Sequence, residues 1–327
     1  MASGWLGCAL IGPGNFGRGL ARALCEDQRV RFVGVLGATP AESIAGAAEL
    51  GGRAYASIAE LLPDAAVQAV LIATPSDTHA ALAIAAAQAG KHVFVEKPMA
   101  LTVAECDAMI AAAASTTLMI GQLQRFFPLL AEVRERVHAQ QIGQPLTTLM
   151  WRHDMLQRAP GSWLQQRARV GGLLHQSCVH EIDWLRTVHG EVAHTSARLP
   201  AVPIQAGLDF PDAAELCLTF ASGTIATLSA CMTSYLPAHG GVIHGTHGTI
   251  RFDLLAGSLA WHTASGERGH HQREAYTVQA GHRVATRIEL RAFVDAALGL
   301  AAPTVPGSEG RANVAVIAAA LALAQIS

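Results

Sequence analysis

The chain has 327 residues, of which 51% are hydrophobic and 15% charged, and its formal net charge is −2. This composition excludes a disordered chain, and the length exceeds one typical domain, so we expect two domains with large buried cores. Acids and bases nearly balance and no basic block occurs, which argues against a nucleic-acid partner and favours a small molecule.

The amino-terminal stretch MASGWLGCALIGPG has no basic residue ahead of its apolar run, which argues against a secretion signal or a membrane anchor. Other apolar runs are too short to cross a bilayer. The cysteines lack CxxC spacing, and we expect small buried thiols in a reducing cytoplasm. No metal-ligand spacing occurs, so no metal is expected; His270 and His271 are expected in a solvated polar loop over 264–274. The six cysteines are Cys8, Cys25, Cys106, Cys178, Cys217 and Cys231.

Apolar runs and helical patterns alternate over the first 125 residues. Alternation of this kind predicts a doubly wound parallel sheet, the α/β class, with a first domain over 1–125. Thr102 and Glu105 form a capping box, and Gly90 is placed to end a helix. The expected strands are 5–12, 30–36, 66–75, 92–98 and 118–121, and the expected helices are 20–27, 41–50, 76–90 and 102–114.

A different pattern begins at residue 126. Short runs with partial period-2 alternation, separated by glycine turns, predict an antiparallel sheet, with a helix inserted over 174–189 and a final helix over 313–325. We therefore expect a second, α+β domain over 126–327, whose last helix can return to pack on the first domain. The expected strands lie in 145–153, 214–221, 223–232, 248–253 and 258–263, and loops 153–171 and 232–247 are expected to shape a pocket.

The segment GPGNFG lies between the first expected strand and the first helix. Gly12 allows a tight turn, Gly14 lets backbone approach a pyrophosphate, and Gly17 lets the helix pack on the strand. The positive end of the helix faces the phosphates. In this context the pattern predicts a dinucleotide site; a purely structural turn is the alternative.

Gly37 stands at the end of the second strand, where an acidic residue that accepts the adenosine ribose hydroxyls is expected. Its absence removes acceptors for NAD and a charge that would repel a 2′-phosphate, which slightly favours NADP. Thr39 could donate to that phosphate, and Arg18 or Arg53 would have to supply the cation. A loop using backbone contacts alone is the alternative. An aspartate at position 37 would then favour NAD.

Glu96-Lys97-Pro98 follow a buried strand, where ligands of doubly wound sheets gather. Pro98 keeps Lys97 out of the helical region, which favours a functional lysine over a snorkelling surface residue. Thr74 and Pro75 end the preceding strand and can line the same crevice.

The helix over 174–189 places Gln176, His180 and Asp183 on one face, because they are spaced four and three residues apart. Leu174, Val179, Ile182 and Leu185 can face the core. A histidine near a lysine in a crevice can exchange a proton at neutral pH. A lone helical histidine is more often structural, and the polar neighbours make His180 a functional candidate.

Four segments together resemble the Gfo/Idh/MocA family, the relatives of glucose-fructose oxidoreductase and inositol dehydrogenase: GPGNFG, ATPSDTHAALAIAAAQAGKHVFVEKPMALT, GGLLHQSCVHEIDWLRTVHGE and HGTHGTIRFD. The resemblance covers nearly the whole chain in the right order. It implies a Rossmann domain, then an open, mostly antiparallel sheet domain that shapes the substrate pocket and mediates homodimers or homotetramers.

The resemblance also implies an NAD(P)-dependent oxidoreductase of a sugar, a polyol or a related cyclic hydroxy compound. Lys97 would contact substrate and nicotinamide, and His180 would be the acid/base on the reacting hydroxyl. Arg125, in a QRF segment, would lie near the nicotinamide or pair with an acid at the domain junction. The expected substrate-binding residues are Gln176, Arg125, His153 and Trp163. The expected cofactor-binding residues are Gly12, Gly14, Asn15, Phe16, Gly17, Gly37, Thr39, Thr74, Pro75, His79, Glu96 and Lys97.

Three positions depart from the family pattern. Gln176 stands where Asp or Asn is common, Cys178 where Gly is common, and Gly37 replaces the cofactor acid. Gln176 and Gly37 leave open a sensor that binds dinucleotide or sugar without turnover. His153 and Trp163, with Arg167, leave open a dihydrodiol or aromatic-acid dehydrogenase.

Overall fold

The computed structural model describes residues 5–326; residues 1–4, which begin the amino-terminal stretch discussed above, and residue 327 lie outside the described residues. The chain divides into two compact units, the first comprising Met1–Gln122 and Thr286–Val314 and the second Leu123–Ala285 and Ala315–Ser327. Helices α9 (Val278–Ala297) and α10 (Gly307–Ala322) therefore each contribute residues to both units.

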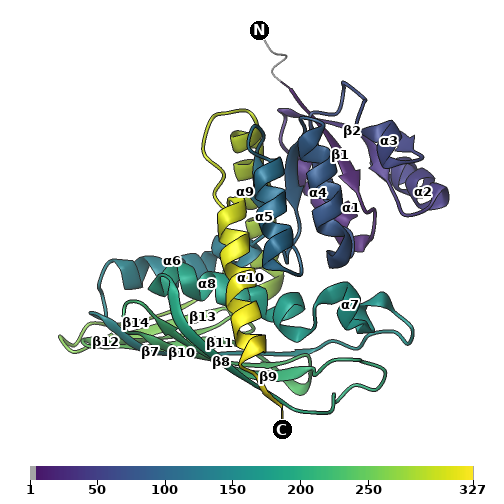
Figure 1. Cartoon of the computed structure of the whole chain (residues 1–327). Helices are drawn as coiled ribbons and strands as arrows, with labels where there is room; N and C mark the ends of the chain where they lie inside the picture. The colour runs from purple at the N-terminus through teal and green to yellow at the C-terminus, as the bar shows by residue number, and fades with distance from the viewer. Residues whose placement is uncertain (1–4, 327) are drawn as a thin grey trace. The chain divides into compact units, whose positions relative to one another are not determined.

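The first unit contains a six-stranded sheet in the order β3-β2-β1-β4-β5-β6 (Figure 1), and every neighbouring pair is parallel. This confirms the doubly wound parallel sheet. Helix α1 packs beside α2 and α4 beside α5. The strands are β1 (Leu6–Ile11), β2 (Val30–Leu36), β3 (Arg53–Tyr55), β4 (Ala69–Ile72), β5 (His92–Val95) and β6 (Leu118–Ile120). The helices are α1 (Asn15–Leu24), α2 (Pro40–Leu50), α3 (Ile58–Leu61), η1 (Ser76–Thr78), α4 (His79–Gln88) and α5 (Val103–Ala112).

Two predicted helix ends in this unit are confirmed, whereas the first helix, expected over 20–27, is α1 at Asn15–Leu24. Thr102 and Glu105 form the capping box of α5, in which each side chain accepts from the other residue's backbone N–H. Gly90 follows α4 with φ of +76°, a conformation that glycine adopts without a Cβ clash. Strands β1 and β4 are buried throughout, as central strands of a parallel sheet should be.

The second unit contains a nine-stranded sheet in the order β14-β13-β12-β11-β7-β10-β9-β8-β15. The sheet is mostly antiparallel, as predicted, but β7 pairs with β10 and β8 with β15 in parallel. Its strands are β7 (Pro145–Met155), β8 (Val192–Leu199), β9 (Ala213–Phe220), β10 (Ile225–Cys231), β11 (Thr233–Gly245), β12 (Gly248–Asp253), β13 (Ser258–Thr263), β14 (Arg268–Gln272) and β15 (Gln325–Ile326). Its helices are η2 (Leu123–Phe126), α6 (Pro128–His138), η3 (Trp163–Gln165), α7 (Arg167–Val170), η4 (Leu174–Cys178), α8 (Val179–His189) and η5 (Glu274–Tyr276).

Helices α6 and α8 cover one face of this sheet and form its core (Figure 1). The predicted apolar face is confirmed, because Leu174, Val179, Ile182 and Leu185 are all buried. Trp184 of α8 donates from its indole to the Leu130 carbonyl at 3.1 Å, and its ring meets that of Phe252 edge-on. A buried indole is well satisfied by such a carbonyl partner. Helix α8 is thus held rigidly against both α6 and the sheet.

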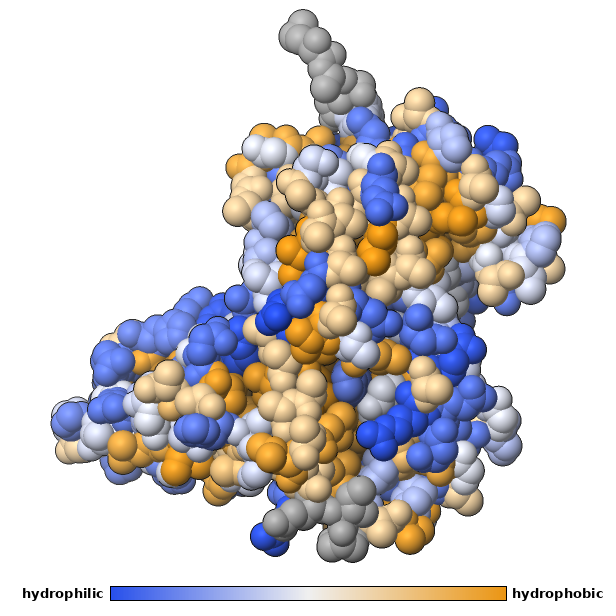
Figure 2. Space-filling view, viewed as in Figure 1, coloured by the Kyte–Doolittle hydropathy of each residue, from blue (hydrophilic) through white to orange (hydrophobic). Residues whose placement is uncertain are grey.

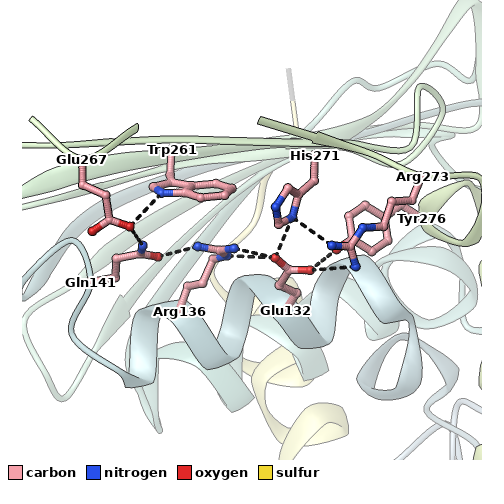
Figure 3. A network of polar contacts seen from close by, with 8 residues as sticks. All are labelled: Glu132, Arg136, Gln141, Trp261, Glu267, His271, Arg273 and Tyr276. Carbon is pink, nitrogen blue, oxygen red and sulfur yellow. Dashed lines mark hydrogen bonds and ion pairs between the residues drawn. The ribbon is translucent and has the colours of Figure 1, made fainter. Parts of the chain in front are cut away.

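The prediction of a solvated loop over 264–274 is wrong. Residues 268–272 form β14, and His271 contacts Glu132 of α6 at 3.1 Å and packs edge-on against the Trp261 ring (Figure 3). Arg136 stacks 3.6 Å from the centroid of Trp261 and bonds Glu132 at 2.7 Å. A strand made of Arg, Gly, His and Gln is therefore held by polar contacts with α6, which a hydrophobicity pattern does not reveal.

The prediction of a loop over 232–247 is also wrong, because β11 occupies nearly all of this segment. The strand pairs with β12 on one side and β7 on the other, with a register shift between Thr233 and Ala238. Gly240 and Gly241 approach neighbouring backbone so closely that an added Cβ would lie 2.3 Å from Phe252 O and 2.7 Å from Leu149 O. These glycines permit close strand packing.

The cysteine prediction holds for three residues. Cys8, Cys106 and Cys178 are buried, and burial raises the thiol pKa of each, that of Cys106 to about 12. Cys25 is exposed instead.

No helix within residues 5–326 is both long and apolar enough to cross a bilayer. Hydrophobic residues, coloured tan and orange, nevertheless cover much of the visible surface of α4 and α5 (Figure 2).

Candidate functional site

The sequence-predicted cofactor residues of the first unit gather at one edge of its sheet. Gly37 follows β2, Gly12 follows β1, Thr74 follows β4 and Glu96 follows β5, and these four strands are consecutive neighbours. Because all of them run in parallel, their carboxyl ends share one edge. The strand order reverses between β1 and β4, and doubly wound sheets bind ligands outside the strands at such a switch point.

The glycine turn after β1 has room for a ligand on one side only. At Gly12, with φ of +95°, a Cβ would lie 2.5 Å from Ala73 O, and at Gly17 it would lie 2.2 Å from Gly12 O. At Gly14 a Cβ would have nothing within 4 Å. Gly14 is also the N-cap of α1 and makes no side-chain hydrogen bond to the first turn of the helix. The turn therefore fits a pyrophosphate at the positive end of α1.

Asn15 and Phe16 begin α1 directly beside this space. Asn15 accepts at Oδ1 from Arg18 at 3.1 Å, and the Phe16 ring is 47% exposed. Both side chains lie at the surface next to the glycine turn, in keeping with their predicted place at the cofactor site.

Backbone N–H groups of the turn after β2 donate hydrogen bonds to side chains at the start of α2. The Gly37 N–H donates to Ser43 Oγ at 2.8 Å, and the Ala38 N–H donates to Glu42 Oε2 at 2.9 Å. Thr39 is the N-cap of α2 and accepts from the Glu42 N–H at 3.2 Å. Sequence reasoning missed Glu42, although Thr39 followed three residues later by Glu is the spacing of a helix start.

The position of Gly37 leaves no space for a side chain. A Cβ there would lie 2.5 Å from Glu42 Cβ and 2.9 Å from Ser43 N. Such distances are far inside van der Waals contact, so the start of α2 would have to move. An aspartate at position 37, which was expected to favour NAD, would need this shift of α2, and its effect on cofactor preference stays a prediction.

The two arginines considered for a 2′-phosphate are both paired with carboxylates. Arg18 bonds Glu49 at 2.9 Å as well as Asn15, and Arg53 bonds Glu60. Surface pairs of this kind are weak, but each arginine would have to give up its partner to meet a phosphate.

Lys97 lies just beyond the carboxyl end of β5 and is half-buried. Its neighbour Glu96 is 8% exposed and accepts from the Lys97 N–H at 3.2 Å. Burial raises the pKa of Glu96 to about 7, while the positive charge of Lys97 opposes that shift. Gly121 makes room for the carboxylate, because a Cβ there would lie 2.9 Å from Glu96 Oε1. A lysine and a buried carboxyl group whose pKa is raised are therefore neighbours at the carboxyl end of β5.

His79 lies beneath this edge and does not face it. The ring is 1% exposed and bridges two strand-end loops, with Nδ1 2.8 Å from the Pro98 carbonyl and Nε2 2.9 Å from the Thr74 carbonyl. Burial lowers its pKa. Thr78 fastens the same loop, since its hydroxyl contacts Thr74 Oγ1 and the Pro75 carbonyl, each at 2.7 Å. His79 thus positions Thr74 and the segment that carries Lys97.

The predicted catalytic helix of the second unit begins with a π-helical turn, η4, that continues into α8. Gln176 lies in η4 and His180 in the first turn of α8, and both are half-buried. The helix around them is otherwise buried on nearly every side. A π turn directly before a candidate functional residue is a recurrent feature of functional sites.

A buried ionic network holds this turn, and sequence reasoning missed it. Glu181, which is fully buried, accepts from Arg152 at 3.1 Å and lies 3.2 Å from His239 Nε2. Arg152 of β7 also donates to the Ser177 carbonyl at 3.0 Å. Burial opposes ionisation of Glu181, but the charge of Arg152 and a hydrogen bond from His239 outweigh it and hold the pKa far below its usual value. The network fixes the residue directly after His180.

Arg125 pairs with an acidic residue, which was the alternative to a place near the nicotinamide. Its guanidinium bonds both carboxylate oxygens of Asp183, each at 2.6 Å, and Asp183 is fully buried. A bidentate pair of this kind fixes η2 against α8. Asp183 therefore serves Arg125, although the sequence placed it on the same face as His180.

His153 does not lie with His180. Side chains alternate along β7, and Arg152 faces α8, so His153 points from the opposite face of the sheet. There it contacts Ser229 Oγ at 3.1 Å, and Ser229 donates to the exposed Glu215. His153 therefore lies on the face of the sheet opposite α8, and its predicted role as a substrate-binding residue stays a prediction. Trp163 begins η3 and is 38% exposed.

A parallel doubly wound sheet with an open glycine turn, combined with a second unit built on an open sheet, defines a two-domain dinucleotide-binding protein. Residues 6–122 match the oxidoreductase family with an NAD-binding Rossmann fold, Gfo/Idh/MocA, and residues 130–251 match the Gfo/Idh/MocA C-terminal domain. The chain belongs to the Gfo/Idh/MocA oxidoreductase family, as the sequence motifs suggested.

Two relatives and one solved structure illustrate this. The 2,7-anhydro-N-acetylneuraminate hydratase of Escherichia coli K12 is 31% identical over 258 residues, 76% of this chain and 68% of that protein. Inositol 2-dehydrogenase of Rhizobium meliloti is 32% identical over 67% of each chain. The crystal structure of a putative myo-inositol dehydrogenase from Sinorhizobium meliloti 1021 has a TM-score of 0.82 at 26% identity and covers 97% of each chain.

Proposed function

We propose that this protein is a nicotinamide-dependent oxidoreductase that interconverts a secondary alcohol and a carbonyl on a sugar, a polyol or a related cyclic hydroxy compound. One observation carries the proposal: the glycine turn, the Thr74 loop and Lys97 follow β1, β4 and β5, which are adjacent parallel strands of one sheet. Cofactor and substrate contacts therefore share the edge where such sheets bind ligands.

The residues of the first unit fit a dinucleotide. Gly14 and the uncapped start of α1 would bind the pyrophosphate, and the Thr74–Pro75 loop would line the same crevice. When bound, the nicotinamide supplies the hydride chemistry.

Lys97 and His180 would have different roles at the substrate oxygen. The ammonium of Lys97 would donate to the reacting oxygen and orient it, and His180 would take the hydroxyl proton when the alcohol is oxidised or return it in the reverse direction. Glu96 would keep the Lys97 segment in place through the backbone N–H that it accepts. Gln176 is one turn from His180 and would bind a further substrate hydroxyl.

The relatives support the substrate class. Inositol is a cyclic polyol, and 2,7-anhydro-N-acetylneuraminate is a sugar derivative whose ring carries hydroxyl groups. The structure gives no support to an aromatic-acid substrate, because His153, one of the residues suggested for it, lies on the other face of the sheet from α8.

The preference for NADP stays a prediction that rests only on the missing acid at position 37. The expected oligomer, a homodimer or homotetramer through the second sheet, is likewise proposed here. It is supported by Leu149 and Ile225, which lie on adjacent strands and are 48% and 45% exposed on the face opposite α8. Light scattering of the purified protein distinguishes these assemblies from a monomer.

A panel of cyclic polyols, sugars and anhydro-sugars, each supplied with NAD or NADP, tests the activity through absorbance of the reduced nicotinamide. Turnover of at least one compound is expected, and it should be lost in Lys97→Ala. Saturable binding of a sugar and a dinucleotide without reduction by any compound would favour the sensor and contradict the enzyme.

A further inference from the structure

The carboxylate absent at residue 37 is replaced from the next helix. We propose that Glu42 of α2 takes the role of the adenosine-ribose acceptor and makes the site selective for NAD over NADP. This inference rests on the proposed dinucleotide site. It reverses the preference expected from Gly37 alone.

The first argument is position. Glu42 Oε2 accepts from the Ala38 N–H at 2.9 Å, so the carboxylate lies over the turn that directly follows β2. Strand β2 is the neighbour of β1, which carries the glycine turn. Within residues 5–326, Oε1 of Glu42 has no hydrogen-bond partner, and the side chain is exposed. A carboxylate oxygen at the cofactor edge thus remains available to two ribose hydroxyls.

The second argument is that Gly37 is required by Glu42. A Cβ at residue 37 would lie 2.5 Å from Glu42 Cβ, so an acidic residue at the strand end and Glu42 in its present place exclude each other. The absence of a side chain at position 37 is therefore the condition that lets the start of α2 close over the turn. The acid is displaced by five residues along the chain rather than lost.

The third argument is that nothing in the turn is disposed to bind a 2′-phosphate. The N–H groups of Gly37 and Ala38 already donate to Ser43 and Glu42. Thr39 Oγ1 accepts from the Glu42 N–H and has one proton left to donate. No lysine or arginine occurs between Arg31 and Arg53. A dianionic phosphate would therefore meet a carboxylate and a single hydroxyl donor.

The chain supplies a matched control for Glu42. Glu60 at the start of α3 has the same local geometry: its Oε2 accepts from the Ala56 N–H at 2.8 Å, and its N–H donates to the N-cap Ser57. Glu60 follows the edge strand β3 and not β2. A Glu60→Gln variant therefore removes the charge of a similarly placed carboxylate, together with its pair with Arg53, without touching the turn that follows β2.

The test is a fluorescence titration of the full-length protein with NADH and with NADPH, for the wild type and for Glu42→Gln, Glu42→Ala and Glu60→Gln, each shown to be folded by circular dichroism. Wild type and Glu60→Gln should bind NADH more tightly than NADPH, by roughly ten- to a hundredfold, the range of one charge-assisted hydrogen bond. Both Glu42 variants should lose most of that ratio, through weaker NADH and stronger NADPH binding.

Equal or tighter binding of NADPH by the wild type would overturn the inference, as would an unchanged ratio in the Glu42 variants. Either result leaves the dinucleotide site itself intact. If the folded wild-type protein binds neither dinucleotide, the proposed function fails first and the role of Glu42 falls with it.

Discussion

Two glycines at the cofactor edge have opposite reasons for being glycine. At Gly37 a Cβ would collide with Glu42, whereas at Gly14 it would meet open space. We therefore expect Gly37→Ala to lower the free energy of unfolding by about 1–3 kcal/mol, the usual cost of overpacking. Gly14→Ala should leave stability nearly unchanged and weaken NADH binding, because its methyl group occupies the space proposed for the pyrophosphate. Urea denaturation and NADH titration of both variants check this, and equal stability losses would contradict it.

The proposed roles of Lys97 and His180 can be tested by two different kinetic measurements. Lys97→Ala should reduce turnover by about a hundredfold or more, the usual loss when a hydrogen-bond donor aimed at the reacting oxygen is removed, while NADH affinity stays close to that of the wild type. His180→Gln should remove the neutral-pH inflection from the pH profile of kcat/KM. Steady-state kinetics between pH 5 and 9 provide both readouts. A wild-type profile retained in His180→Gln would assign the proton to another group.

His189 makes stability depend on pH. Burial, and to a lesser degree the charge of His138, lowers its pKa from 6.5 to about 4, so the folded chain keeps the ring neutral while the unfolded chain protonates it. Stability from this residue is complete above pH 6.5 and falls as the pH drops towards 4, by on the order of 3 kcal/mol. His189→Gln can keep the contact with Thr148 Oγ1 and cannot titrate. The wild type should lose stability relative to this variant on acidification, and parallel curves would contradict the assignment.

At the scale of elements, alternating apolar runs predicted every strand of the first sheet except β3, which is only three residues long. The strands of the second sheet were harder to predict from the sequence. Strand β14 consists of Arg, Gly, His and Gln, and its stability comes from the Glu132–Arg136–Trp261 cluster, which joins segments more than a hundred residues apart. Gly240 and Gly241 of β11 pack against residues of β12 and β7 that are distant from them or not recognisable as partners in the sequence pattern. Periodicity reports local burial and is silent on such partners.

The π turn and α8 form one element whose geometry depends on the Glu181 network. Glu181→Gln would leave Arg152, held at 3.1 Å in a buried site, without its main counter-charge. We expect the free energy of unfolding to fall by about 3–5 kcal/mol, as when one member of a buried ion pair is removed. Glu26→Gln is the control, because Glu26 pairs with Arg287 and their side chains are 51% and 63% exposed, and it should cost less than about 1 kcal/mol. Similar losses in both variants would show that the network does not stabilise this element.

For the candidate site, the motifs located the edge of the first sheet but not the details of its chemistry. The glycine turn and Lys97 occupy the places that their strand context predicted. Glu42, Arg152 and His239 were missed because their roles depend on side-chain contacts that no spacing encodes. The face on which His153 lies could not be read from the motifs, because one residue along a strand changes the face of the sheet.

For the whole molecule, the central claim is that a bound substrate reduces the nicotinamide through its carbinol hydrogen. The most direct measurement is stopped-flow absorbance after mixing NAD-loaded protein with a cyclic polyol that it binds, prepared with hydrogen or deuterium on the carbinol carbon. We predict that reduced nicotinamide appears in the first turnover and appears more slowly with deuterium. The claim would be contradicted if every compound of the panel that binds saturably to the protein failed to produce reduced nicotinamide.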